Sequence, residues 1–204
     1  MKTRFLTTVC ALLTLAVLLG GCSAGAEKAP KKEVGIQLYS VRSLIGAFGN
    51  NQEDYKPVLK QLADMGYTSV EAASYKDGKI YGQTPEQFRK DVEEAGMKVL
   101  STHCTINLSD EELAAGDFSK ALAWWDECIA AHKAAGAEYI VVPSMRKVST
   151  LEELATYCRY FNEIGARCKA AGLKFGYHNH SREFEKIEDR VMLDYMIENT
   201  DPDK

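Results

Sequence analysis

The sequence predicts an α/β protein whose fold is a parallel (β/α) barrel, with about five of the eight βα units present. One short pattern occurs four times: the end of an amphipathic helix, a glycine, and then an apolar strand. These glycines, at positions 66, 96, 136 and 172, are 30 to 40 residues apart, the length of one strand plus one crossover helix. Gln37-Leu38-Tyr39 follows the first strand, where a nucleotide-binding sheet would carry a glycine-rich loop. A closed barrel is therefore favoured over an open, doubly wound sheet.

Helix starts and strand positions fit this alternation. Thr84 is placed to cap the start of one helix, and two further starts have the pattern of a capping box, Ser109 with Glu112 and Ser149 with Glu152. Strands are expected from short apolar runs bounded by turn or charged residues, at 34–39, 69–73, 98–103, 138–143 and 174–178.

The number of units indicates that the barrel is incomplete. A complete eight-stranded barrel takes roughly 250 residues. This chain of 204 residues supplies five strands and a last helix expected over 189–199. Five strands alone would leave an open sheet edge. We therefore expect the chain to be a fragment, truncated at its C-terminal end, of a longer protein.

The first 33 residues are typical of an export signal followed by a tether. Lys2 and Arg4 precede an apolar run over 5–19, and Gly20-Gly21-Cys22 follows it. This order is similar to a bacterial lipoprotein signal, so residues 1–21 are expected to be a signal peptide and Cys22 to carry lipid. The alternative is an ordinary secretory signal with an incidental cysteine. Residues 22–33 then form a flexible tether, and residues 34–204 form the N-terminal part of the barrel. We expect a lipid-anchored protein of the bacterial cell envelope, at the outer membrane or in the periplasm.

The net charge and the cysteine spacing argue against a nucleic-acid partner and against a zinc site made of cysteines. The net charge is -4 and the basic residues are scattered, so we expect no nucleic-acid partner, and contact with membrane through the lipid anchor only. Besides Cys10 in the signal and Cys22, four cysteines remain, and no spacing typical of a zinc site is found among them. We expect these four to be buried free thiols: Cys104, Cys128, Cys158 and Cys168.

Polar side chains gather at the predicted carboxyl ends of the strands, where the catalytic groups of a barrel lie. Glu71 could act as a base, as a metal ligand or only as the partner of Arg42. His178 and His180 are two residues apart on an extended segment, so they could share a divalent metal or a sugar hydroxyl. The alternative is a hydrogen-bonded polar plug at the barrel mouth. The whole set comprises Gln37, Tyr39, Arg42, Glu71, His103, His178, Asn179, His180 and Glu183.

Two segments carry a resemblance to a known family. Residues 35–42, with the sequence GIQLYSVR, and residues 176–184, with the sequence GYHNHSREF, resemble segments of the sugar phosphate isomerase/epimerase family. These proteins, also called xylose isomerase-like barrels, share their TIM-barrel fold with endonuclease IV. The resemblance implies a divalent cation (Mn²⁺, Mg²⁺, Co²⁺ or Zn²⁺) held by carboxylates and a histidine of strands five to eight. It also implies two acidic residues that move a proton between adjacent carbons of a sugar.

Roles follow from the strand-end positions and this resemblance. Where epimerases of the family carry a glutamate on strand five, this chain has Tyr177-His178, with Glu183 a few residues later. Most metal ligands are expected in strands six to eight, which the chain does not contain. We assign catalysis to Glu71, His103 and Glu183, substrate binding to Gln37, Tyr39, Arg42 and Asn179, and metal binding to His178 and His180.

The expected function is a metal-dependent isomerase or epimerase acting on a saccharide or sugar derivative at the cell envelope. Export favours a free saccharide over a sugar phosphate, because sugar phosphates are mostly cytoplasmic. The alternative is a non-catalytic saccharide-binding lipoprotein with the same barrel. DNA repair by analogy with endonuclease IV is disfavoured, because the chain is acidic overall and lacks a basic groove.

Overall fold

The computed structural model describes residues 32–52 and 54–204. The predicted signal peptide, Cys22 and nearly all of the tether lie outside the described residues. The described part of the chain folds as one compact unit, Glu33–Lys204. Its helices, within the residues described, all fall short of the length and apolar character that a membrane crossing requires.

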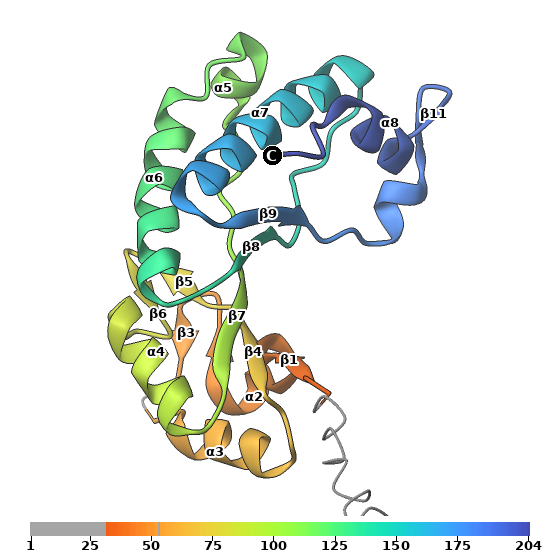
Figure 1. Ribbon diagram of the computed structural model, residues 1–204. Coiled ribbons are helices and arrows are strands. Elements are labelled where there is room, and N and C mark those ends of the chain that lie inside the picture. Colours follow the sequence, from red (N-terminus) through yellow and green to blue (C-terminus); the bar gives the residue numbers. More distant parts are fainter. Residues whose placement is uncertain (1–31, 53) are drawn as a thin grey trace, which may run out of the picture. The chain divides into compact units, whose positions relative to one another are not determined.

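Five parallel strands form the central sheet, and they follow one another in chain order (Figure 1). This order, with a helix after each of the first four strands, confirms the predicted α/β fold and gives five of the eight strands of a TIM barrel. The strands are β1 (Gly35–Gln37), β4 (Ser69–Ala72), β7 (Lys98–His103), β8 (Tyr139–Val142) and β9 (Lys174–Tyr177). Each lies within one residue or two of the run predicted for it.

The main crossover helices bury one face against the sheet. The main crossover helices end in glycines at positions 66, 96, 136 and 172, which all have positive φ angles between 79° and 100°. Glycine adopts this left-handed conformation without steric cost, so the predicted helix stops are confirmed. The α-helices are α2 (Arg42–Ile45), α3 (Lys56–Asp64), α4 (Pro85–Glu94), α5 (Asp110–Ala115), α6 (Ser119–Ala134), α7 (Leu151–Ala171) and α8 (Met192–Asn199). There are also two 3₁₀ turns. The first, η1 (Leu38–Val41), follows β1, and the second, η2 (Ser181–Phe184), precedes the last hairpin.

Three short antiparallel hairpins follow strands β1, β4 and β9. They pair β2 (Gly46–Ala47) with β3 (Asn50–Asn51), β5 (Tyr75–Lys76) with β6 (Lys79–Ile80), and β10 (Lys186–Ile187) with β11 (Arg190–Val191). The last hairpin shows that the helix predicted over 189–199 was placed too early, because residues 190–191 belong to β11. The helix begins only at Met192, since the chain first reverses direction at Glu188, whose φ angle is 53°.

Of the three predicted helix caps, those at Thr84 and Ser109 were correct and the one at Ser149 was wrong. The Ser109 hydroxyl accepts from the Glu112 backbone N–H and the Glu112 carboxylate accepts from the Ser109 N–H, which is the predicted capping box. Helix α7 is capped one residue later than predicted, because Thr150 Oγ1 accepts from the backbone N–H of Glu153. The Glu153 carboxylate accepts from the Ser149 N–H, so Ser149 lies just outside the helix. Either hydroxyl could cap here, and the extended backbone of Thr150 decides between them.

The apolar side chains form two core clusters. One packs α3 and α4 against the first three strands around Leu38, Leu59 and Phe88. The other packs α6, α7 and α8 against the last two strands around Trp125 and Ile164. These clusters fix the strands, so the polar residues at the carboxyl ends of the strands stand on a rigid base.

Candidate active site

The register between β1 and β4 brings the first two site residues together. Gln37, the last residue of β1, is the direct neighbour of Glu71 in β4. Neighbouring parallel strands lie about 4.8 Å apart, so side chains on the same face of such a pair touch. Gln37 Nε2 donates a hydrogen bond of 2.8 Å to Glu71 Oε1.

A bulge between β4 and β7 positions the third residue. Val70 pairs with Val99 but Glu71 pairs with Ser101, so one extra residue of β7 lies at this point. Bulges re-aim side chains and are common beside active sites. His103, at the end of β7, lies with its Nε2 3.0 Å from Glu71 Oε1 and is 8% exposed. The sheet thus holds Gln37, Glu71 and His103 in one hydrogen-bonded group.

The hydrogen bonds define a charged carboxylate beside an oriented imidazole. Burial alone would raise the pKa of Glu71, but the hydrogen bonds from His103 and Gln37 outweigh it and lower that pKa to about 2. Each atom has a partner when His103 Nε2–H donates to Glu71 and Nδ1 accepts from Gln37 Nε2, which lies 3.1 Å away. A carboxylate with so low a pKa is a weak proton acceptor. In this group the charged Glu71 carboxylate orients the His103 ring.

Two more imidazoles lie next to this group. The ring centroid of His178 is 5.2 Å from that of His103, edge to face, and 4.7 Å from that of His180. Partial loss of water around the ring and the neighbouring His103 and His180 lower the pKa of His178. Both His178 and His180 are exposed, so they remain open to a ligand. The structure thus brings together three of the four histidines, all from strand ends.

A pocket of about 230 Å³ opens in front of these residues. Among the predicted site residues, Gln37, Tyr39, His103, His178 and His180 line it. Ala73, Thr105, Pro143, Ser144 and Phe48 complete the wall. Sequence reasoning missed Phe48, which lies in the turn of the β2–β3 hairpin with its ring centroid 5.4 Å from that of Tyr39. The flanking Gly46 and Gly49 were the available signal, because paired glycines are typical of a tight turn.

The other predicted site residues lie outside the pocket wall. Arg42 does not contact Glu71; its guanidinium donates to the Tyr39 carbonyl and lies over the Tyr39 ring. Asn179 is exposed and does not line the pocket.

Glu183 is 1% exposed, and its carboxylate is held within its own loop. It accepts from the Tyr177 hydroxyl at 2.8 Å and from the His180 backbone N–H at 2.7 Å. Although burial opposes it, these bonds lower the pKa of Glu183. Such contacts position the loop that carries His178 and His180. A catalytic role for Glu183 stays a prediction.

The strand-end residues bring together fewer donor atoms than a divalent metal needs. A metal site gathers at least three donor atoms around one point. In the described part of the chain, the one group of three such donors within 4.8 Å of one another is Cys104, Cys128 and His132, not the strand-end set. His178 and His180 therefore do not close a metal site with the other described residues. Metal binding by these two histidines stays a prediction, and such a metal would need further ligands.

The low pKa of Glu71 predicts a specific pH dependence of stability. The folded-state pKa of about 2 lies below the usual 4.5. The stabilisation from the charged carboxylate is therefore complete above about pH 4.5 and is lost as the pH falls toward 2. Urea unfolding of the wild type and of Glu71→Gln between pH 2 and 6 measures it. The stability difference between them should shrink by about 1–3 kcal/mol as the pH falls. Equal pH dependence of the two proteins would contradict the paired carboxylate.

Fold and site together define a class: a parallel (β/α) barrel protein with a histidine and carboxylate site at the carboxyl ends of its strands. Residues 59–204 match the model of the xylose isomerase-like TIM barrel family. The chain belongs to this family, whose members often use divalent metals.

Several solved structures are similar to the chain. A sugar phosphate isomerase/epimerase from Parabacteroides distasonis ATCC 8503 has 30% sequence identity and a TM-score of 0.72, over 85% of this chain and 67% of that one. A second from the same organism has 24% identity and a TM-score of 0.71, over 88% and 68% of the two chains. A xylose isomerase domain protein from Planctomyces limnophilus is 12% identical, with a TM-score of 0.53 over 86% and 62%, and shows the shared fold alone. Among curated proteins, none matches the chain.

Proposed function

We propose that this protein is a sugar isomerase or epimerase that moves a proton between adjacent carbons of a saccharide at the bacterial cell envelope. The observation that carries the proposal is the hydrogen-bonded group of Gln37, Glu71 and His103 at the strand ends, of which Gln37 and His103 line a pocket. Family membership and the similarity to a sugar phosphate isomerase/epimerase support it.

His103 is the residue proposed to carry the proton. Its Nε2–H is held by Glu71, so Nδ1 is the ring atom left to face a substrate once Gln37 turns its amide toward a sugar hydroxyl. The charged Glu71 then stabilises the imidazolium that forms when His103 takes the proton. His178, edge to face with His103, limits how far the His103 ring can turn.

The pocket wall favours a sugar without a phosphate group. Phosphate recognition in proteins relies on arginine, lysine or helix N-termini. Within the described residues, the pocket is lined by amide, hydroxyl, imidazole and aromatic groups and by no lysine or arginine. Hydroxyl-rich ligands suit such a wall. The predicted export signal points the same way, because free saccharides are the form expected outside the cytoplasm.

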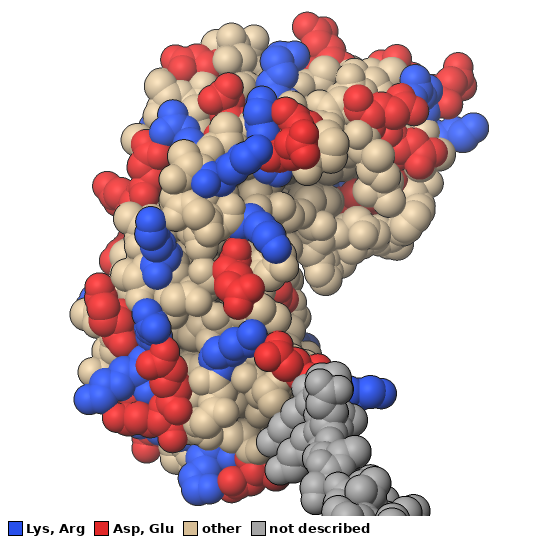
Figure 2. Space-filling view, viewed as in Figure 1, with Lys and Arg blue, Asp and Glu red and all other residues tan. Residues whose placement is uncertain are grey.

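The surface gives no support to a polyanionic partner. On the face shown in Figure 2, acidic and basic side chains of the described residues are interspersed, without a basic patch. The net charge of -4 agrees with this.

A divalent metal remains part of the proposal, with His178 and His180 as its first ligands. It would polarise the carbonyl and hydroxyl of the sugar. Because these histidines do not converge with a third described donor, no step above depends on it. The lack of a third described donor beside His178 and His180 favours a second function, which is saccharide binding without catalysis.

The proposal is tested on the protein expressed from its own gene through the native stop codon. We expect isomerisation or epimerisation of a free ketose or aldose, with uptake of solvent deuterium at the reacting carbon seen by NMR. His178→Ala should lower this turnover at least about tenfold. Lys147→Ala, an exposed change outside this pocket, is the control. Metal content is measured in parallel.

Three other results would change the proposal. Saccharide binding by calorimetry without turnover would establish the binding module. A preference for the phosphorylated form of the same sugar would overturn the substrate class. Full activity of His178→Ala would remove His178 from the site.

A further inference from the structure

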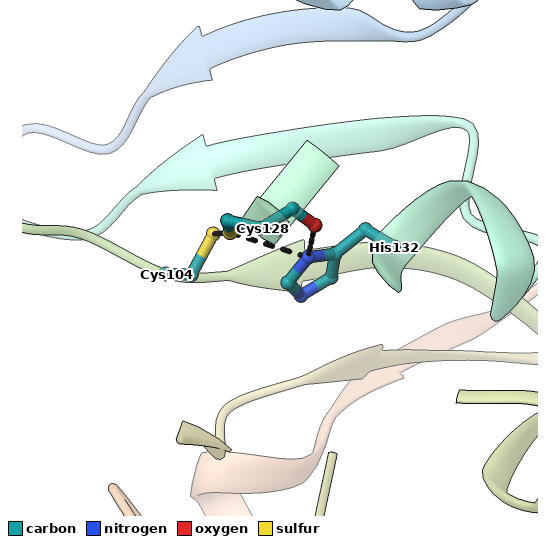
Figure 3. Close-up of side chains that lie close together, drawn as sticks. All are labelled: Cys104, Cys128 and His132. Carbon is teal, nitrogen blue, oxygen red and sulfur yellow. Dashed lines mark hydrogen bonds between the residues drawn. The ribbon is translucent and has the colours of Figure 1, made fainter. Parts of the chain in front are cut away.

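Two cysteines from different elements meet in the interior, away from the pocket. Cys104 directly follows β7, and Cys128 lies in α6. Their Sγ atoms are 3.2 Å apart, and the side chains are 6% and 0% exposed. Figure 3 shows the two sulfurs facing each other, with His132, one helical turn after Cys128, beside them. The spacing along the sequence gave no sign of this pair.

The neighbouring histidine does not make the pair a nucleophile. His132 Nδ1 lies 2.6 Å from the Cys128 carbonyl oxygen, so Nδ1 carries the proton of that hydrogen bond. Burial lowers the pKa of His132 to about 4, and burial also raises the pKa of Cys128. Nδ1 is also the ring atom beside the Cys128 sulfur, at 3.3 Å, and a nitrogen that already carries a proton does not remove one from the thiol. The thiolate that a catalytic cysteine needs is therefore disfavoured here.

The same hydrogen bond argues against a metal. The three donors lie within 4.8 Å of one another, as in a site of two cysteines and one histidine. Nδ1, the His132 atom in contact with the Cys128 sulfur at 3.3 Å, carries a proton and so offers no lone pair to a metal. A metal bound to Nδ1 would also displace this proton. The Cys128 carbonyl oxygen would then face Nδ1 at 2.6 Å with no hydrogen between the two atoms. Structural zinc sites have four ligands, and no fourth described donor joins these three.

We propose that Cys104 and Cys128 form a reversible disulfide under oxidising conditions. A disulfide has an S–S distance of about 2.05 Å, so the sulfurs must approach by about 1.2 Å from their 3.2 Å contact. Cys104 lies at the junction of a strand and a loop, which can supply this movement more easily than α6.

The reaction balances with a small disulfide as oxidant. The Cys104 thiolate attacks one sulfur of the small disulfide, which forms a mixed disulfide and releases one thiol. The Cys128 thiolate then attacks Cys104 Sγ and releases the second thiol. Two electrons and two protons pass from the protein to the oxidant. Because both side chains are buried, the exchange takes place while the chain folds or opens locally.

The bond would close a segment that borders the candidate active site. It joins residues 24 positions apart and encloses α5 and the first part of α6. Cys104 directly follows His103, so the bond would also fix the strand end that carries His103. Bacterial periplasm is a compartment in which such bonds form, which agrees with the predicted export signal.

The other two thiols provide an internal control. Cys158 and Cys168 lie ten residues apart on α7, about 15 Å along the helix axis. Both are buried and free. They share the cellular compartment and the burial of the proposed pair but cannot bond each other.

The test is refolding of the full chain in mixtures of reduced and oxidised glutathione, followed by trypsin digestion and mass spectrometry. We expect the peptides 99–120 and 121–133, which contain one cysteine each, to appear as a linked pair lacking two hydrogens. Oxidation should raise Tm by about 5–10 °C, and dithiothreitol should reverse it. Cys104→Ser should abolish the link and the shift, whereas Cys158→Ser should keep both.

Thiol counting on the unfolded wild-type protein makes the result independent of whether the variants fold. Loss of the Cys104 and Cys128 thiols after oxidation supports the proposal. Retention of both, a link that involves Cys158 or Cys168, or stoichiometric zinc that depends on Cys104 and Cys128 would overturn it.

Discussion

Replacing Glu71 by glutamine is expected to lower sugar turnover by about 10²–10⁴-fold while the protein stays folded. Glutamine has the same shape, so the contact with Gln37 and the packing at the end of β4 are kept. The negative charge that holds His103 Nε2–H and stabilises the imidazolium is lost. kcat should fall and KM should change little, because the lost charge acts on the proton transfer and not on substrate binding.

Glu93→Gln is the matched control for this prediction. It makes the same chemical change on the exposed side of α4, where Glu93 pairs with Arg89 at 2.7 Å. Its turnover should equal that of the wild type, since exposed helix ion pairs contribute only about 0.3–0.5 kcal/mol. If Glu71→Gln retained wild-type turnover, Glu71 would be a structural residue and the proton-transfer proposal would lose its basis.

The fold could be predicted from the sequence to the extent that its signals are local. Gly66, Gly96, Gly136 and Gly172 end their helices as expected, because a left-handed residue after a helix is a property of a few neighbouring positions. The start of α7 was misplaced by one residue, since Ser149 and Thr150 are equivalent caps in sequence and only the structure shows that Thr150 Oγ1 caps the helix. The hairpins after β1, β4 and β9 were missed because two-residue strands carry no periodicity.

The site could be predicted in composition but not in its contacts. Barrel geometry places Gln37, Glu71 and His103 at strand ends, and the structure has all three there. Their hydrogen bonds depend on the β1–β4 register and on a bulge opposite Val70, neither of which a single sequence reveals. The sequence allows Glu71 to pair with Arg42, but Arg42 follows the 3₁₀ turn η1 and lies over the Tyr39 ring instead.

Substitution of Trp125 is expected to lower the free energy of unfolding more than substitution of any other residue, because Trp125 of α6 contacts both α7 and the sheet. The side chain is 0% exposed, and its Nε1–H donates to the Tyr160 hydroxyl on α7 at 2.7 Å. Tyr160 in turn donates to the Ile106 carbonyl, and the Trp125 ring lies edge to face with Phe175 of β9. Trp125→Ala should lower the free energy of unfolding by about 3–5 kcal/mol, from lost burial and the cavity left behind. Urea unfolding followed by circular dichroism measures it.

Two variants separate packing from the hydrogen bond. Trp125→Phe keeps an aromatic ring in the core and leaves the Tyr160 hydroxyl bonded to Ile106, so it should cost clearly less than the alanine change. Trp124→Ala removes the neighbouring, partly exposed indole and should also cost less, because that ring is not fully buried. If Trp124→Ala and Trp125→Ala lowered the free energy of unfolding equally, burial of Trp125 between α6 and α7 would not be the main source of stability in this core. A large loss for Trp125→Phe would instead place most of the stabilisation in the bond to Tyr160, since the apolar area removed by that change is small.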